Sequence, residues 1–263
     1  MYARRSVERI PTPWVESGHA LTLEMVVYKP LGAGPYPTLI FHHGSTGAGD
    51  KPELFTQTYW SETIAKVFVD QGWQVLFPQR RGRGTSDGLY DEGFEPDRSR
   101  YSCRQQYALP GLVHALDDAE VILTDVRARA DVDPSRLLVG GVSRGGILAM
   151  AHAAQHPDEY VGVVIFVGGW LGEACVDAVP VNRSTFVSAA TLPRPSLWLY
   201  GQNDTFYSID HSQANFDAFV AAGGKGAFEV YRRSDPTANG HGIANEPSLW
   251  RDDLLAYLGQ LAR

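Results

Sequence analysis

The stretch from residue 137 to residue 146, LLVGGVSRGG, constrains the fold more than any other part of the chain. Its apolar half predicts a buried strand, and a helical pattern follows it through residues 147–151, with Ser143 in the turn between them. Gly141 and Gly145 complete a G-x-S-x-G frame, whose small residues let a strand and a helix pack closely around a strained turn. The stretch therefore predicts a serine hydroxyl at the edge of a sheet, beside the free N–H groups of a helix N-terminus.

A second G-x-S-x-G frame, at residues 84–88, shows that the bare pattern carries little weight. The segment after Ser86 is polar, contains glycine and proline, and has no helical pattern. We therefore predict that Ser143 is a nucleophile and that Ser86 is a turn residue.

The composition limits the classes of protein to consider. Of the 263 residues, 44% are hydrophobic, which is enough for a sizeable core, and no linker interrupts a single predicted domain over residues 1–263. A net charge of −7 without a basic block argues against nucleic acid or an anionic membrane as partner. No apolar run reaches transmembrane length, and residues 1–9 lack the apolar stretch of a secretory signal. The expected location is therefore the cytoplasm.

Strand and helix patterns alternate along the chain. We expect strands at residues 20–28, 38–41, 73–77, 137–142, 161–167, 196–200 and 228–231, and helices at residues 60–70, 112–130, 212–222 and 246–261 as well as after Ser143. This alternation predicts an α/β fold with a mostly parallel central sheet and helices on both faces, preceded by an antiparallel meander. In such sheets the functional side chains lie beyond the carboxyl ends of the strands.

Two insertions, about residues 82–110 and 168–195, leave the carboxyl ends of strands and are expected to form a minimal cap over Ser143. Five aromatic side chains are candidates to line it or to pack these loops down: Tyr90, Phe94, Tyr101, Tyr107 and Trp170.

A serine nucleophile needs a base and a carboxylate that orients the base. His241 lies in a glycine-containing loop between the last strand and the last helix, where a base can reach over the sheet edge. Asp204 directly follows a strand, whereas Asp210 lies farther on, at the expected start of a helix. We predict a Ser143–Asp204–His241 triad. Five other histidines fall away from strand ends and are expected to have surface or packing roles: His19, His114, His152, His156 and His211.

The remaining parts of the predicted site are less specific. The backbone N–H groups of Arg144 and Ser45 are the expected oxyanion donors. Arg81 is a candidate to bind a substrate carboxylate, although ion pairing with Asp87, Asp91 or another local acid is favoured. Adjacent strand residues such as His42 and His43 face opposite sides, and no zinc-binding motif is present, so no metal is predicted.

The elbow, the His-Gly turn and the order Ser143, Asp204, His241 resemble the α/β-hydrolase superfamily over nearly the whole chain. Residues 78–86, PQRRGRGTS, and 133–136, DPSR, are similar to its dienelactone-hydrolase-like and prolyl-oligopeptidase-like branch. That resemblance implies hydrolysis of esters, lactones or peptides without a cofactor. Dienelactone hydrolases proper have cysteine at the position of Ser143, and the peptidases usually carry a propeller domain for which this chain has no room, so a small esterase is favoured.

Cys103 and Cys175 lie one in each cap-like insertion. Because cytosolic disulfides are rare, the sequence favours two reduced thiols. The alternative, implied by the resemblance to secreted relatives of this branch, is a Cys103–Cys175 bridge that pins the cap.

The predicted function is a cytoplasmic serine hydrolase that cleaves small-molecule carboxylic esters through an acyl-serine, without cofactor or metal, as a monomer or homodimer. The alternatives are an aminopeptidase or a lactonase on the same triad, or a catalytically silent hydrolase fold that binds a ligand.

Overall fold

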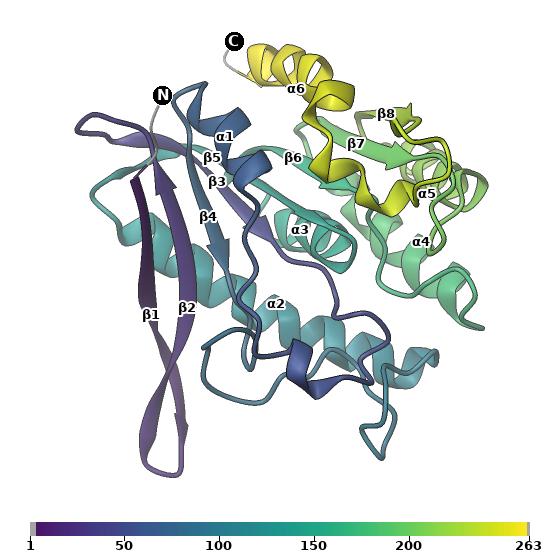
Figure 1. Cartoon of the computed structure of the whole chain (residues 1–263), viewed down its shortest axis with the longest axis horizontal. Coiled ribbons are helices and arrows are strands. Elements are labelled where there is room, and N and C mark those ends of the chain that lie inside the picture. Colours follow the sequence, from purple (N-terminus) through teal and green to yellow (C-terminus); the bar gives the residue numbers. More distant parts are fainter. Residues whose placement is uncertain (1–3, 262–263) are drawn as a thin grey trace.

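The computed structural model describes residues 4–261, and an eight-stranded sheet lies at its centre (Figure 1). The strand order is β1-β2-β4-β3-β5-β6-β7-β8. The strands are β1 (Arg4–Glu16), β2 (His19–Lys29), β3 (Tyr36–His42), β4 (Gln74–Pro78), β5 (Val132–Val142), β6 (Tyr160–Phe166), β7 (Ser196–Gly201) and β8 (Gly226–Tyr231). Residues 1–3, part of the N-terminal segment considered above for a secretory signal, lie outside the described residues.

The sheet is parallel except at its beginning. β1 pairs antiparallel with β2, and β2 pairs antiparallel with β4, while every pairing from β4 through β8 is parallel. The central strands β3, β4, β6 and β7 are buried almost throughout, and β5 is buried over its apolar residues 137–141. The predicted mostly parallel sheet with an N-terminal meander is therefore confirmed.

Helices cover both faces of the sheet (Figure 1). On one face lie α1 (Glu62–Val69) and α6 (Pro247–Leu261), which contact each other. On the other lie α2 (Gln105–Ala128), α3 (Arg144–Gln155), α4 (Ala178–Ser188) and α5 (Ile209–Ala221). Short 3-10 helices occur at Pro52–Leu54, Ala189–Thr191 and Gly240–Asn245 (η1, η2 and η3).

Both cap-like insertions are more ordered than the sequence predicted. α2 begins at Gln105, seven residues before the expected start, because it contains Pro110 in its first turns instead of beginning after it. The second insertion includes the whole of α4. The irregular part of the first insertion is thus shorter than residues 82–110.

The close approach between α2 and this insertion depends on Gly111, because a Cβ there would collide with the backbone of Glu92 and Gly93. Among the described residues, no helix combines the length and the apolar character needed to cross a bilayer.

Candidate active site

Ser143 lies at the turn between β5 and α3, where the chain is conformationally strained. Its φ of 56° and ψ of −122° fall in a region that residues other than glycine rarely adopt. The turn is held because the Ser143 amide donates to the Phe166 carbonyl (2.9 Å) and because Gly145 packs directly on the backbone of His42. A Cβ at position 145 would overlap that backbone, which explains the glycine of the motif.

The structure brings Asp204 and His241 together, although they are 37 residues apart. His241 Nδ1 and Asp204 Oδ2 are 2.8 Å apart. The Asp204 side chain is fully buried, whereas the imidazole is one-fifth exposed. Asp204 follows β7 and His241 lies in η3, so the loop position expected for the histidine is in fact a short 3-10 helix. This pair has the geometry of a carboxylate that fixes the tautomer of a histidine.

Asn239 ties the two segments that carry this pair. Its Oδ1 accepts hydrogen bonds from the amides of His241 (2.9 Å) and Thr205 (3.2 Å), and its Nδ2 donates to Thr205 Oγ1 (2.7 Å). The sequence did not single out Asn239. Its position two residues before the predicted base was the only signal, because its partner Thr205 is distant in the chain.

Ser143 and His241 both line one cavity. Within the described residues 4–261, their side chains are not hydrogen-bonded to each other. The Ser143 side chain instead interacts with the Tyr207 hydroxyl, which also donates to the Gly169 carbonyl (2.8 Å). Burial raises the pKa of Tyr207 far above its ordinary range, so this hydroxyl stays protonated beside the serine. Tyr207 is a second site residue that the sequence did not indicate.

The turn after β3 faces Ser143 across a very small gap. A Cβ on Gly44 would lie 3.1 Å from that of Ser143. His43 holds the turn: its Nε2 accepts from the Arg80 amide (3.3 Å), and its Nδ1 lies 2.8 Å from the Gly44 carbonyl oxygen and 3.0 Å from Arg80 Nη2. Burial, and then the charge of Arg80, keep the pKa of His43 well below its ordinary value. The following residue, Ser45, lines the cavity, as does Arg144.

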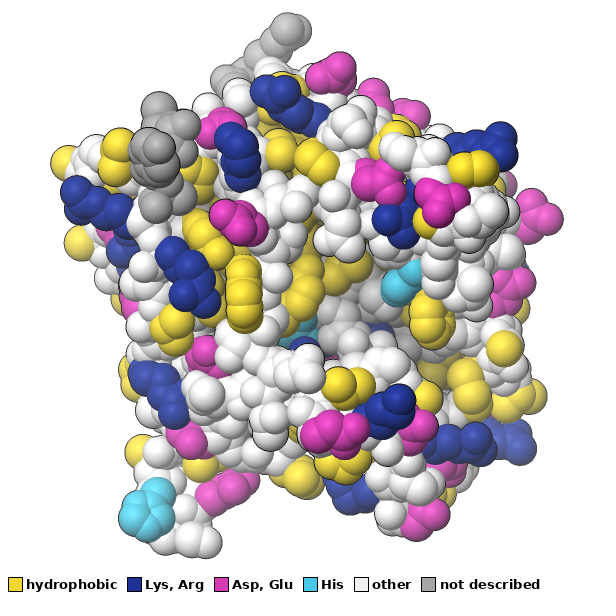
Figure 2. All heavy atoms as spheres, viewed as in Figure 1, with side chains coloured by type: hydrophobic (Ala, Val, Ile, Leu, Met, Phe, Trp, Pro, Cys, Tyr) yellow, Lys and Arg dark blue, Asp and Glu magenta, His cyan; other side chains and the backbone are white. Residues whose placement is uncertain are grey.

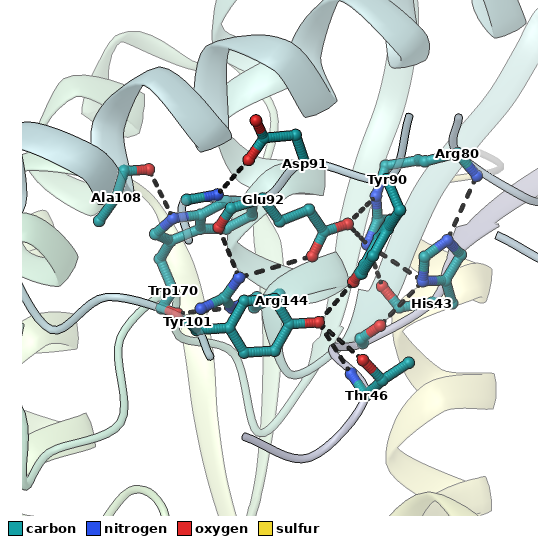
Figure 3. Close-up of polar contacts among 12 residues, drawn as sticks. His43, Thr46, Arg80, Tyr90, Asp91, Glu92, Tyr101, Ala108, Arg144 and Trp170 are labelled. Atoms are coloured by element: carbon teal, nitrogen blue, oxygen red, sulfur yellow. Dashed lines mark hydrogen bonds and ion pairs between the residues drawn. The ribbon is translucent and has the colours of Figure 1, made fainter. Parts of the chain in front are cut away.

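The Arg144 side chain is fully engaged by the protein (Figure 3). Its guanidinium donates to the carbonyls of Trp170 (2.9 Å) and Glu92 (2.7 Å) and lies 3.6 Å from the Glu92 carboxylate. The rings of Tyr101 and Trp170 flank it, with centroids 3.9 and 4.8 Å from the guanidinium carbon. Arg144 therefore fixes the two cap-like insertions against the turn that carries Ser143.

Glu92 also pairs with Arg80 on its other side (2.5 Å), and all three charged side chains are almost fully buried. Figure 3 shows the Glu92 carboxylate between the two guanidinium groups. Nothing in the polar, loop-like sequence around Glu92 indicated a buried charge.

The cavity has a volume of about 580 Å³. The face seen in Figure 2 is hollowed near its centre, with hydrophobic side chains along one side of the hollow. Trp170 and Tyr101 line the cavity, as predicted, together with Tyr59 and Phe206. Tyr90 and Phe94 instead pack with Tyr101 in a small aromatic cluster, and Tyr107 is not among the lining residues.

Cys103 and Cys175 form a disulfide, and both line the cavity. The expectation of two reduced thiols is therefore wrong, and the bridge between the two insertions is present. The two cysteines are 72 residues apart in the sequence and are brought together only by folding, so their spacing could not predict the bond.

Arg81 does not lie in the cavity. Its guanidinium donates to the fully buried Asp118 (2.5 Å) and to the His114 carbonyl (2.9 Å), and it lies over the Trp14 ring, 3.9 Å from its centroid. The candidate substrate contact of Arg81 is therefore corrected: the side chain makes an ion pair, as the sequence favoured, but its partner is Asp118 and not Asp87 or Asp91. Ser86 is buried and bridges the Glu24 amide and the Gln79 carbonyl, a structural role as predicted.

Parts of the chain are similar to curated proteins. Over 148 residues, 52% of the chain, it is 25% identical to poly(3-hydroxyalkanoate) depolymerase C of Paucimonas lemoignei, of which the match covers 33%. Over 123 residues, 46% of the chain, it is 28% identical to a probable inactive carboxylesterase of Oryza sativa subsp. japonica, of which the match covers 44%. The chain thus spans less than half the length of these curated relatives.

Solved structures share the whole fold. A candidate dienelactone hydrolase from Klebsiella pneumoniae subsp. pneumoniae superposes with a TM-score of 0.61 at 20% identity, covering 98% of this chain and 99% of that one. Dipeptidyl peptidase 4 of Porphyromonas gingivalis gives a TM-score of 0.66 at 16% identity, covering 99% of this chain and 35% of that one. A family model described as alpha/beta hydrolase fold matches residues 37–208. Since this match includes more than half of the chain, the protein belongs to the alpha/beta hydrolase fold family.

Proposed function

We propose that the protein is a serine hydrolase that cleaves carboxylic esters of small substrates through an acyl-serine intermediate. One observation carries the proposal: the 2.8 Å contact between Asp204 Oδ2 and His241 Nδ1 lies at the cavity that also holds the strained Ser143. A buried carboxylate, an imidazole and a serine at one cavity are the parts that nucleophilic acyl transfer needs.

The hydrogen bond between His241 and Asp204 determines which nitrogen of His241 transfers protons. Because Nδ1–H donates to Asp204, Nε2 is the nitrogen left to accept a proton. His241 takes the Ser143 proton as Oγ attacks the ester carbonyl, and returns it to the departing alcohol oxygen, which leaves an acyl-serine. Water then attacks the acyl carbon with His241 again as base, and Ser143 regains its proton as the acid departs. Catalytic hydrogen bonds are often long without substrate, so we expect the Ser143–His241 bond to form on binding.

The amides of Ser45 and Arg144 are the proposed donors to the oxyanion. Support comes from the first position of Arg144 in α3, where a helix leaves its N–H groups free, and from the close contact of Gly44 with Ser143. Loss of one such donor typically lowers kcat by about 10² to 10³.

The cavity favours small substrates. A volume of about 580 Å³ is typical of small-molecule sites, and its aromatic lining suits an apolar acyl or alcohol group. Because the Arg144 guanidinium is bound to Glu92 and Trp170, Arg144 offers no free charge for an acidic substrate.

A fluorophosphonate probe tests the proposal on the intact protein. We expect labelling that mass spectrometry maps to Ser143, hydrolysis of p-nitrophenyl acetate, and the loss of both in Ser143→Ala. A folded protein that neither labels nor hydrolyses any ester would instead be a silent binding fold. Faster cleavage of aminoacyl anilides or lactones than of matched esters would favour the aminopeptidase or the lactonase.

A further inference from the structure

A second cluster of polar side chains lies between α2 and α3, away from the residues that line the cavity. His152 lies in α3, and His156 is the residue that ends it, one helical turn later. Glu120 faces them from α2. Its Oε2 is 2.6 Å from His156 Nε2 and 3.7 Å from His152 Nε2, and the three ligand atoms all lie within 4.8 Å of one another.

His152 supplies the observation that points to a ligand. Its side chain is fully buried, yet Nε2 has no hydrogen-bond partner among the described residues. Its Nδ1 lies 3.0 Å from the Tyr160 hydroxyl. An imidazole whose Nδ1–H donates to that hydroxyl presents the Nε2 lone pair towards Glu120 and His156. A buried polar atom without a partner is costly, and a bound ion would satisfy it.

The donor set matches a particular class of cation. Two imidazole nitrogens and one carboxylate are common zinc ligands, and a water molecule completes four-coordination. Metal-binding histidines also typically donate their second ring N–H to an outer partner, as His152 can to Tyr160.

Among the described residues, the ion pairs of Glu120 are only with the two histidines. The nearby acid Glu159 is paired with Arg127 (3.0 Å), whereas Glu120 contacts the two imidazoles. The Glu120 side chain is half exposed, so it can adjust to ideal ligand distances and leave the fourth position open to water.

We propose that Glu120, His152 and His156 bind one divalent transition-metal ion of the zinc class, which links α2 to the helix that begins at the nucleophile. The sequence did not indicate this site because its carboxylate comes from a different helix, more than thirty residues before His152. The inference is independent of the proposed esterase activity.

Zinc titration of the chelator-treated protein tests the site. We expect one Zn²⁺ per chain by calorimetry, with His156→Gln and Glu120→Gln each weakening binding by at least about tenfold. The exposed His19 gives a matched control, since His19→Gln should bind like the original protein. Asp204→Asn should also bind unchanged, which separates this site from the active site.

Two further measurements distinguish ligation from an ion pair between His156 and Glu120. X-ray absorption of the zinc-loaded protein should show two imidazole ligands. Tyr160→Phe should weaken zinc binding by about tenfold while all three ligands remain. Absence of stoichiometric binding, or folded His156→Gln and Glu120→Gln variants that bind as well as the original, would overturn the proposal.

Discussion

Asp204 divides its two carboxylate oxygens between two partners. Oδ2 contacts His241 Nδ1, and Oδ1 accepts the amides of Phe206 (2.8 Å) and Tyr207 (3.2 Å). The carboxylate therefore orients the imidazole and also holds the turn that brings the Tyr207 hydroxyl to Ser143. An uncharged amide at this position could keep the second task but not the first.

Asp204→Asn is expected to lower kcat for p-nitrophenyl acetate by about 10⁴, because the amide favours the wrong tautomer of His241. The melting temperature should change little, since the asparagine carbonyl can still accept the two amides. Asp210→Asn is the matched control: Asp210 is exposed in the first turn of α5, so kcat should stay unchanged. An active Asp204→Asn variant would refute the assigned roles.

His42 makes stability depend on pH. It is fully buried, and neither ring nitrogen has a hydrogen-bond partner within residues 4–261. Burial, and then the charge of Arg80, lower the pKa of His42 well below 6.5. Below about pH 6.5 the unfolded chain therefore binds a proton that the folded chain does not, and the free energy of unfolding falls as the pH decreases.

His42→Leu should flatten this dependence. Between pH 6.5 and 5 we expect the slope of the unfolding free energy to decrease by up to about 1.4 kcal/mol per pH unit, measured by urea denaturation. The slope should not vanish, because His43 is buried in the same way. His19→Leu, at an exposed position, should leave the slope unchanged, and an unchanged slope in His42→Leu would contradict the argument.

At the scale of elements, the segment between β4 and α2 is attached by buried ion pairs to Arg144, the residue after Ser143. Glu92 lies between Arg80 and Arg144, and all three are buried. Removing one partner from a buried ion pair leaves the other charge without compensation. Loss of the Glu92 carboxylate would leave two such charges, those of Arg80 and Arg144. The two buried guanidinium groups therefore share a single carboxylate.

Glu92→Gln should lower the free energy of unfolding by about 3–5 kcal/mol, as measured by chemical denaturation. We also expect a higher KM, because Arg144, whose guanidinium lies against the cavity-lining rings of Trp170 and Tyr101, would lose the carboxylate beside it. Glu95→Gln makes the same change three residues along the segment, outside this ion-pair network, and should alter stability by less than about 0.5 kcal/mol. Equal effects of the two substitutions would count against the network.

The disulfide is a second attachment, between the two insertions. It closes a separation of 72 residues, so Cys103→Ser/Cys175→Ser should cost about 2–4 kcal/mol of stability. The untreated protein should show no free thiol until reductant is added. Two free thiols in the untreated protein would contradict the bond.

Disulfide bonds persist in oxidising compartments, so the Cys103–Cys175 bond argues against the expected cytoplasmic location.

For the whole molecule, local sequence predicted the sheet and the order of the site. Features set by residues adjacent in the sequence could be predicted. They include the apolar strands, the glycines around Ser143, and the positions of Asp204 and His241 after strands. The 2.8 Å contact between Asp204 and His241 agrees with that prediction. The homodimer stays a prediction, which light scattering would test.

The features that sequence could not predict arise from contacts between distant segments. The start of α2 was predicted too late because proline usually disrupts a helix interior, whereas α2 contains Pro110. Glu92 resembled a solvated loop acid, since its two arginine partners are brought to it only by folding. The sequence favoured an ion pair for Arg81 but could not identify the partner, because Asp118 lies in α2 and meets Arg81 only in the folded chain.

The bond between Cys103 and Cys175 also changes the covalent topology around Ser143. Ser143 lies between these cysteines, so the backbone from β5 through β6 belongs to a closed ring. A protease that cut one peptide bond inside this ring would leave both halves joined, and no fragment carrying the serine could diffuse away. Nicking there would instead give a two-chain molecule, tethered at the rim of its own cavity.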